Sequence, residues 1–231
     1  MHQIRTYHPR RGRLSGRHFD ALERLWPGYG VMIAEPPAVG PGAVLDTTVL
    51  FGRQAPVVLE IGSGMGDATA DMAAADPERG YLAVEVHTPG IANLLSLVED
   101  RGLTNLRIAS GDALDLLRYQ LAPQSLDAVH IFFPDPWPKA RHHKRRLIQP
   151  AHVALLASRL APGGTLHCAT DWAHYGEAML TTLTAEPRLA NCYDGYAPRP
   201  AHRPLTKFEQ RGIDAGRGVA DLVFRRTMER P

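Results

Sequence analysis

The sequence predicts an α/β protein with a mostly parallel sheet and helices on both faces of that sheet. Its 231 residues, 44% hydrophobic and 22% charged, suit one globular domain with an extension. From residue 57 onward, short apolar runs alternate with helix-length segments, which is typical of a parallel sheet covered on both sides. We therefore expect a basic N-terminal extension with a short helix at 1–33, a connector rich in Pro and Gly at 34–56, and the main domain at 57–231.

Local signals predict the individual elements. Residues 1–14 are basic and aperiodic, so we expect them to be mobile without a partner. Ser15 suits the cap of a short helix that the Pro-Gly pair at 27–28 would end. Pro89 suits the first position of a later helix, and Gly102 suits its end. The expected strands lie at 57–61, 81–86, 106–109, 126–133, 165–169, near 192–193 and at 219–224, and the further helices lie up to residue 75, at 112–121, at 148–160 and after residue 173.

Charge is distributed unevenly along the chain. Residues 1–24 carry +4 and residues 139–146 carry +5, so a net charge of +2 leaves −7 on the remainder. A mildly acidic body with two basic segments favours a polyanionic partner such as a nucleic acid.

The cysteines and the apolar runs exclude several other classes of protein. Cys168 and Cys192 provide neither a disulfide framework nor a zinc site, and we expect no metal. No apolar stretch is long enough to span a bilayer, and the N-terminus lacks the apolar core of a signal peptide. We therefore expect a cytoplasmic protein without membrane contact.

A glycine-rich turn follows the first strand of the main domain. Gly62, Gly64 and Gly66 let the backbone approach a ligand closely, and the helix after them offers unpaired N–H groups. A dinucleotide fingerprint that starts at Gly62 and Gly64 would place its third glycine where Asp67 stands. Because a carboxylate at that helix start would repel a pyrophosphate, the turn argues against a dinucleotide-dependent dehydrogenase.

Carboxylates mark the ends of successive strands, at the edge where open α/β sheets bind ligands. Glu60 belongs to the first strand, and Glu85 ends the second, where a carboxylate can accept from both hydroxyls of a ribose. Asp112 follows the third strand and can accept from an adenine amino group, cap the next helix, or do both. The three together indicate a nucleoside ligand with a positive centre and no phosphate, and S-adenosylmethionine fits that description.

Asp135 stands in a stiff turn between Pro134 and Pro136, after the fourth strand and beside Trp137. The basic run 141–146 follows almost at once. A rigid carboxylate beside an aromatic ring and a positively charged segment suggests chemistry on a nucleic acid base.

Two later segments add candidates. Asp171 ends the fifth strand. Thr206 and Glu209 have the spacing of a capping box, and the Lys207 and Phe208 between them offer a donor and a stacking surface.

Several motifs together resemble the bacterial tRNA (guanine-N7)-methyltransferase family. The resemblance extends from about residue 52 to the C-terminus and is weaker in the N-terminal segment. The motifs are Leu59-Glu60-Ile61-Gly62-x-Gly64-x-Gly66, Glu85-Val86-His87-x-Pro89-Gly90, Phe133-Pro134-Asp135-Pro136-Trp137-x-Lys139-x-Arg141-His142-x-Lys144-Arg145-Arg146, Thr170-Asp171 and Thr206-Lys207-Phe208-Glu209. The third and the last are not general methyltransferase features, which makes the set specific.

This resemblance implies a Rossmann-like, seven-stranded class I methyltransferase fold that transfers a methyl group from S-adenosylmethionine to a guanine N7 in the tRNA variable loop. The implied cofactor-binding residues are Glu60, Gly62, Gly64, Glu85, Asp112 and Asp135, and Asp135 is also the implied catalytic residue. The implied substrate-binding residues are Lys139, Asp171, Thr206, Lys207, Phe208 and Glu209. The implied RNA contacts are Arg141, His142, His143, Lys144, Arg145 and Arg146.

The chemistry of guanine agrees with these roles. N7 carries an exposed lone pair, so Asp135 suits charge stabilisation and alignment better than proton abstraction. Asp171 or Glu209 could accept from the guanine N1 and N2 donors, which adenine lacks. Trp137 or Phe208 could stack on a splayed base.

Two alternatives stay open. One is a methyltransferase for the adenine amino group, although that class has Pro-Pro after its acidic residue and this chain has Pro-Trp. The other is a methyltransferase-like protein that binds RNA without activity. The oligomeric state, monomer or homodimer, is also open.

Overall fold

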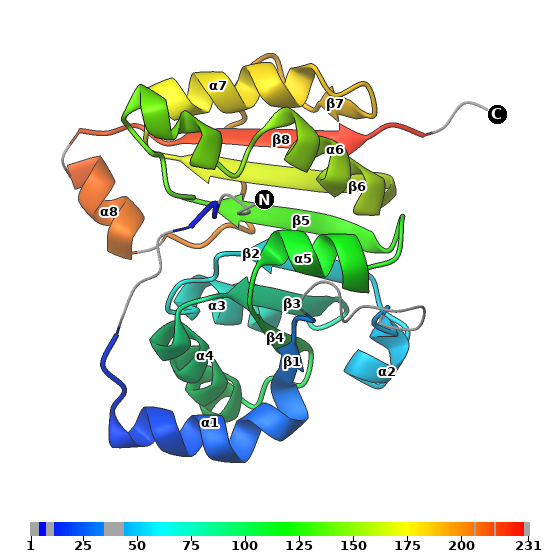
Figure 1. The fold of residues 1–231 in the computed structure, drawn as a ribbon, viewed down its shortest axis with the longest axis vertical. Helices are drawn as coiled ribbons and strands as arrows, with labels where there is room; N and C mark the ends of the chain where they lie inside the picture. The colour runs from blue at the N-terminus through cyan, green and yellow to red at the C-terminus, as the bar shows by residue number, and fades with distance from the viewer. Residues whose placement is uncertain (1–4, 8–11, 35–43, 206, 215, 229–231) are drawn as a thin grey trace.

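One sheet organises the residues that the computed structural model describes, which are 5–7, 12–34, 44–205, 207–214 and 216–228. At 207, 208, 211 and 212 the description covers the backbone alone. The strands run in the order β1-β4-β3-β2-β5-β6-β8-β7, and β8 runs antiparallel to both β6 and β7 while the other described pairs are parallel (Figure 1). Their bounds are β1 Gly30–Met32, β2 Val57–Ile61, β3 Gly80–Glu85, β4 Leu106–Ser110, β5 Leu126–Phe132, β6 Leu160–Thr170, β7 Leu189–Asn191 and β8 Ala220–Arg226.

Helices cover both faces of this sheet. One layer holds α1, α3 and α4, and the other holds α2, α5, α6 and α7, while α8 lies beside the edge to which the parallel strands point (Figure 1). The helices are α1 Gly16–Tyr29, α2 Thr47–Phe51, α3 Asp67–Ala75, α4 Thr88–Arg101, α5 Ala113–Asp115 continued by a π-helical turn Leu116–Gln120, a 3₁₀ segment Ala140–Arg145, α6 Pro150–Arg159, α7 Ala173–Thr184 and α8 Lys207–Asp214. No helix in the described ranges has both the length and the apolar character needed to cross a membrane.

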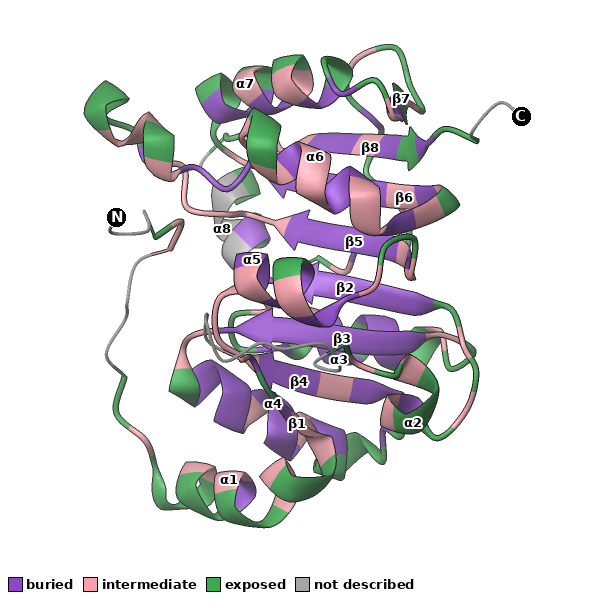
Figure 2. Ribbon diagram, turned by 45° about the vertical axis from the view of Figure 1, so that its right-hand side comes forward, coloured by how far each residue is buried: buried purple, intermediate pink, exposed green. Residues whose placement is uncertain are grey.

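The central strands are buried on both sides, which explains their unbroken apolar sequence. Every residue of β2 and β3 is buried (Figure 2). Successive side chains point to opposite faces of a strand. Leu59 and Ile61 therefore pack against the α5–α7 layer, and Val58 packs against the α3–α4 layer.

The predicted fold class is confirmed, with differences near the N-terminus. The sheet has eight strands instead of seven, because residues 30–32 of the extension pair with β4 at the sheet edge. Helix α1 is capped by Ser15 as expected, but it continues through Pro27 to Tyr29. The N–H of Gly30 closes the last turn by donating to the Trp26 carbonyl, which offsets the bond that proline cannot make.

Several other boundaries follow the sequence signals, but β6 begins at Leu160, where the predicted helix 148–160 ends and before the predicted strand start at 165. Helix α4 begins with Pro89 in its first turn and ends before Gly102, as predicted. The strand expected near 192–193 lies at β7 instead, a few residues earlier. The division of the chain at residue 57 stays a proposal, since both β1 and α2 pack on the same sheet as the rest.

Candidate active site

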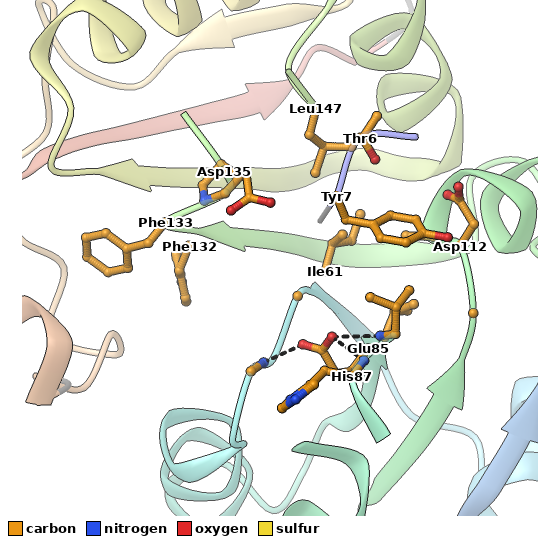
Figure 3. A pocket seen from close by; sticks show the side chains of 17 residues that line it. Thr6, Tyr7, Ile61, Glu85, His87, Asp112, Phe132, Phe133, Asp135 and Leu147 are labelled. Atoms are coloured by element: carbon orange, nitrogen blue, oxygen red, sulfur yellow. Dashed lines mark hydrogen bonds between the residues drawn. The ribbon is translucent and has the colours of Figure 1, made fainter. Parts of the chain in front are cut away.

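A cavity of about 250 Å³ opens where the parallel strands end (Figure 3). The loops after β2, β3, β4 and β5 supply most of its lining, as expected for an open α/β sheet. Three of the predicted carboxylates, Glu85, Asp112 and Asp135, line it together. The lining residues are Thr6, Tyr7, Ile61, Gly62, Gly64, Val84, Glu85, Val86, His87, Gly111, Asp112, Ala113, Phe132, Phe133, Pro134, Asp135 and Leu147.

Glu85 organises the floor of this cavity. One carboxylate oxygen accepts from Gly64 N at 2.7 Å, and the other accepts from Val86 N and His87 N at 2.7 and 2.9 Å (Figure 3). A carboxylate has about four acceptor positions, so three such bonds leave capacity for a ligand hydroxyl. The side chain thus joins the end of β3 to the glycine turn after β2.

The glycine turn needs glycine at specific places. Gly62, Gly64 and Gly66 have φ of +83°, +60° and +84°, the left-handed region that other residues rarely adopt. Helix α4 approaches this turn so closely that a Cβ on Gly90 would lie 2.0 Å from the Gly64 carbonyl oxygen. The turn is therefore fixed by backbone contacts from two sides.

Asp112 begins α5 and performs the predicted capping role. Its Oδ1 accepts from Leu114 N at 2.9 Å. Burial raises the pKa of this carboxyl, and the Leu114 hydrogen bond partly opposes the rise. The ring of Tyr7 lies beside it (Figure 3), and burial followed by the charge of Asp112 raises the pKa of the Tyr7 phenol.

Glu60 is not among the residues that line the cavity. Because it alternates with Ile61 along β2, its side chain faces the α3 layer, where it is 4% exposed. Burial raises its pKa to about 7, an interaction with Thr69 opposes this rise, and the charge of Glu85 adds to it. Within the described residues, Oε2 of Glu60 has no hydrogen-bond partner.

Two residues in unusual backbone conformations flank Asp135. Phe133 and Trp137 have φ of +51° and +45°, which costs energy for residues with bulky side chains. Phe133 N donates to the Ala169 carbonyl at 2.8 Å, which holds the turn against β6. Asp135 is therefore presented to the cavity by a turn that its surroundings fix.

Trp137 is buried and unavailable for stacking on a base, contrary to one sequence expectation. It is 5% exposed, and the Arg145 guanidinium lies 4.0 Å from its ring centroid. Its Nε1 donates to the Thr6 carbonyl at 3.3 Å, and Arg145 Nε donates to the Arg5 carbonyl at 3.4 Å. The tryptophan joins the basic segment to residues 5–7, which the sequence had led us to expect as mobile.

The basic segment divides into exposed and buried members. Lys139, Arg141 and Lys144 are exposed, and Arg145 is half-buried. Arg146 is buried, donates through Nε to the Pro136 carbonyl at 2.9 Å, and has a pKa that burial lowers. Arg146 is therefore not available to bind phosphate, because its buried guanidinium supports the Asp135 turn. His142 and His143 are half-buried.

Basic residues of α1 are less available than their number suggests. Arg17 pairs with Asp100 at 2.5 Å, and Arg24 pairs with both Asp20 and Glu99 at 2.8 Å. These contacts bind α1 to α4 and neutralise part of the positive charge of the extension.

The substrate candidates after β6 differ in environment. Asp171 is partly exposed, and its Oδ2 accepts from Arg217 Nε at 3.1 Å. Glu209 is 1% exposed, and both of its oxygens accept from the Arg203 guanidinium. The predictions for Thr206 and for the side chains of Lys207 and Phe208 fall outside the described residues.

Sequence patterns missed three contributors to this region. Thr6 and Tyr7 lie in an aperiodic segment, which gives no signal for where it docks. Arg203 stands three residues before the recognised motif that begins at Thr206, but a single arginine in a loop does not reveal that it is buried.

The lining fits a cationic nucleoside ligand. Three carboxylates face the cavity, and neither Lys nor Arg occurs among its described lining residues. Such a set attracts a positive centre and repels phosphate. The left-handed glycine turn also leaves open space where a Cβ at Gly62 or Gly64 would stand.

Comparisons with known proteins agree with this site. Residues 54–222 match the family model described as "Putative methyltransferase". The tRNA (guanine-N(7)-)-methyltransferase of Streptomyces avermitilis is 56% identical over 99% of this chain and 77% of its own length. The chain belongs to the tRNA (guanine-N(7)-)-methyltransferase family. A second member, from Nitrosospira multiformis, is 54% identical over 96% of this chain and 94% of its own length. The resemblance inferred from the motifs is thereby confirmed.

Solved structures share the fold of this tRNA (guanine-N(7)-)-methyltransferase family member at low identity. The 16S rRNA methyltransferase KamB is 17% identical with a TM-score of 0.57, covering 80% of this chain and 95% of KamB. The [4+2]-cyclase SpnF is 15% identical with a TM-score of 0.53, covering 92% of this chain and 95% of SpnF. Because a cyclase shares the fold, these likenesses concern architecture and leave the reaction to be argued from the site.

Proposed function

We propose that this family member transfers a methyl group from S-adenosylmethionine to N7 of a guanine in the tRNA variable loop, and that it does so in the cytoplasm. The observation that carries the proposal is the meeting of Glu85, Asp112 and Asp135 at one cavity, next to the exposed basic segment. The names of its relatives support the same substrate and position of methylation.

Two of the three carboxylates bind the adenosine part of the cofactor. Glu85, with its remaining acceptor position, takes a ribose hydroxyl, and Asp112 takes the adenine amino group while it continues to cap α5. Glu60 is buried outside the cavity lining and acts on Glu85 through its charge. Because the pKa of Glu60 is about 7, that charge changes with pH near neutrality. When bound, S-adenosylmethionine supplies an electrophilic methyl group on a positively charged sulfur.

Asp135 stabilises and aligns charge in this scheme. Guanine N7 has a lone pair and no proton, so the chain needs no base to activate it. Positive charge moves from the sulfur to the purine during transfer, and a carboxylate held in a fixed turn stabilises it along that path. The strained residues on either side of Asp135 keep it in place before the substrate arrives.

Recognition of guanine falls to Asp171 in this proposal. Guanine presents donors at N1 and N2, and a partly exposed carboxylate at the end of β6 can accept from them. Glu209 is the weaker candidate, because Arg203 binds both of its oxygens away from solvent. Lys139 and the exposed residues Arg141 and Lys144 bind the phosphates that flank the target nucleotide.

One assay tests the proposed function. The full chain is incubated with labelled S-adenosylmethionine and unmodified tRNA, and the RNA is digested to nucleosides. We expect labelled 7-methylguanosine. Labelled methyladenosine would support an adenine amino-group methyltransferase instead, and unlabelled RNA despite calorimetric cofactor binding would contradict tRNA as the substrate.

A further inference from the structure

Arg203 is one of the largest fully buried side chains in the described part of the protein, at 1% exposure. It lies in the loop between β7 and α8, outside the cavity. We propose that Arg203 is a positioning residue for methyl transfer, holding the segment that carries Glu209 and the turn that carries Asp135 in one arrangement. This inference rests on the proposed function.

The guanidinium binds two carboxylates from different elements. Nη1 and Nη2 donate to Glu209 of α8 at 2.6 and 2.8 Å, a bidentate pair. Nε and Nη2 donate to Asp221 of β8 at 2.9 Å each, a second bidentate pair. Paired N–H donors in a fixed plane set direction as well as distance. Arg203 therefore fixes the orientation of α8 against the sheet.

The same cation contacts the turn before Asp135. Its guanidinium carbon lies 6.0 Å from the ring centroid of Phe132 and 5.6 Å from that of Phe133. Both residues line the cavity, and Phe133 has the left-handed backbone that needs support from its surroundings. A change at Arg203 would therefore reach Asp135 through the strained backbone of Phe133, two residues earlier in the chain.

Further partners complete the charge balance around Arg203. Arg199 Nε donates to Glu209 at 3.2 Å, and His167 Nε2 lies 2.7 Å from Asp221 Oδ1. Buried ion pairs are weak evidence for stability, since apolar replacements are often as stable. A network of this kind beside a substrate segment is better explained by the geometry that it enforces.

Arg203→Lys and Glu209→Gln test the proposal, singly and together. The lysine keeps the charge but loses the planar fork, and the glutamine keeps the shape but loses the charge. We expect each to lower kcat for unmodified tRNA on the order of tenfold to a hundredfold, the scale of a misplaced reacting group. The KM for tRNA and the calorimetric Kd for S-adenosylmethionine should change little, roughly threefold at most, because phosphate and cofactor contacts are intact. The double variant should be no worse than the worse single one.

Glu186→Gln is the matched control. Glu186 is also buried and also binds an arginine, Arg188 Nε at 2.6 Å. It follows α7, however, and so lies near the end of the sheet where the parallel strands begin, away from the cavity. The Glu186→Gln substitution should lower the melting temperature and leave kcat unchanged. If Arg203→Lys does not fold, Glu209→Gln decides alone.

A folded variant with normal kcat overturns the role of Arg203. So does a loss of kcat that Glu186→Gln shares. A wild-type chain that forms no 7-methylguanosine overturns the proposed function itself, and the inference with it.

Discussion

The neighbours of Asp135 hold its carboxylate in position at the cavity. Phe133 and Trp137 adopt left-handed backbone on either side of it, and the buried Arg146 guanidinium binds the Pro136 carbonyl from below. The conformations of Phe133 and Trp137 and the hydrogen bond from Arg146 thus fix the Asp135 carboxylate at the cavity. Such pre-organisation matters because the reaction moves charge without moving a proton.

Asp135→Asn should abolish most turnover without loss of tRNA affinity. The amide keeps the shape and removes the negative charge, so we expect a fall in single-turnover rate on the order of a hundredfold. Asp127→Asn, at the other end of β5 and paired with Arg79 at 3.0 Å, is the control and should retain activity. A near-normal rate for Asp135→Asn would show that the carboxylate is not needed.

Glu60 predicts a pH dependence of stability with a definite sign. Burial raises its pKa from 4.5 to about 7 in the folded state, so the folded protein binds a proton more tightly than the unfolded chain. The contribution of Glu60 to stability is then greatest below pH 4.5, falls as pH rises to about 7, and is level above that. The loss is on the order of 3 kcal/mol for a shift of this size.

Melting temperatures of wild type and Glu60→Gln between pH 5 and 8 measure this effect. The glutamine variant should lack the decline between pH 5 and 7, whereas Glu78→Gln, an exposed control, should keep it. Parallel curves for wild type and Glu60→Gln would mean that Glu60 does not titrate in this range.

At the scale of elements, the site depends on the close approach of α4 to the glycine turn after β2. The two are in contact at Gly90 and Gly64, and the Glu85 carboxylate binds the same turn from β3. The cofactor site is therefore assembled from three segments, none of which makes it alone.

Gly90→Ala should weaken cofactor binding. The new Cβ would lie 2.0 Å from the Gly64 carbonyl oxygen, so helix or turn must move and the Glu85 hydrogen bonds must lengthen. We expect calorimetric affinity for S-adenosylmethionine to fall about tenfold or more, the cost of roughly 1.4 kcal/mol. Gly28→Ala in α1, with no atom within 4 Å of its Cβ, should leave affinity unchanged. Equal affinity for both variants would show that the turn tolerates displacement.

The sequence predicted elements where local chemistry decides them. Pro89 and Gly102 delimit α4 because their backbone preferences act within one turn. Residues 30–32 gave no strand signal, because β1 forms only through pairing with β4. The burial of Arg203 and the place of Tyr7 at the cavity were likewise not predicted, since long-range packing gives each of them its environment. Glu85, Asp112 and Asp135 were predictable because parallel topology alone brings strand ends together. Glu60 was predicted to join them, but the alternation of side chains along β2 turns it toward the α3 layer.

At the scale of the whole molecule, the distribution of charge separates a binding surface from the body. The exposed residues of the basic segment, Lys139, Arg141 and Lys144, lie next to a cavity lined by carboxylates. The arginines of α1 are instead paired with acids of α4. In the proposed function, the basic surface attracts a polyanion and the cavity attracts a cation, which orients an RNA against a sulfonium cofactor.

Salt dependence distinguishes these two groups of cations. Each phosphate contact contributes about 0.7 to 0.9 to the slope of log K against log salt concentration. Arg141→Ala with Lys144→Ala should therefore flatten the slope for tRNA binding by roughly 1.5, with cofactor affinity unchanged. Arg17→Ala with Arg24→Ala removes the same formal charge but only residues already paired with acids, so its slope should match wild type. An equal loss in both double variants would mean that tRNA responds to net charge alone. A loss confined to the first would locate the phosphate contacts beside Asp135, where the guanine must lie for transfer.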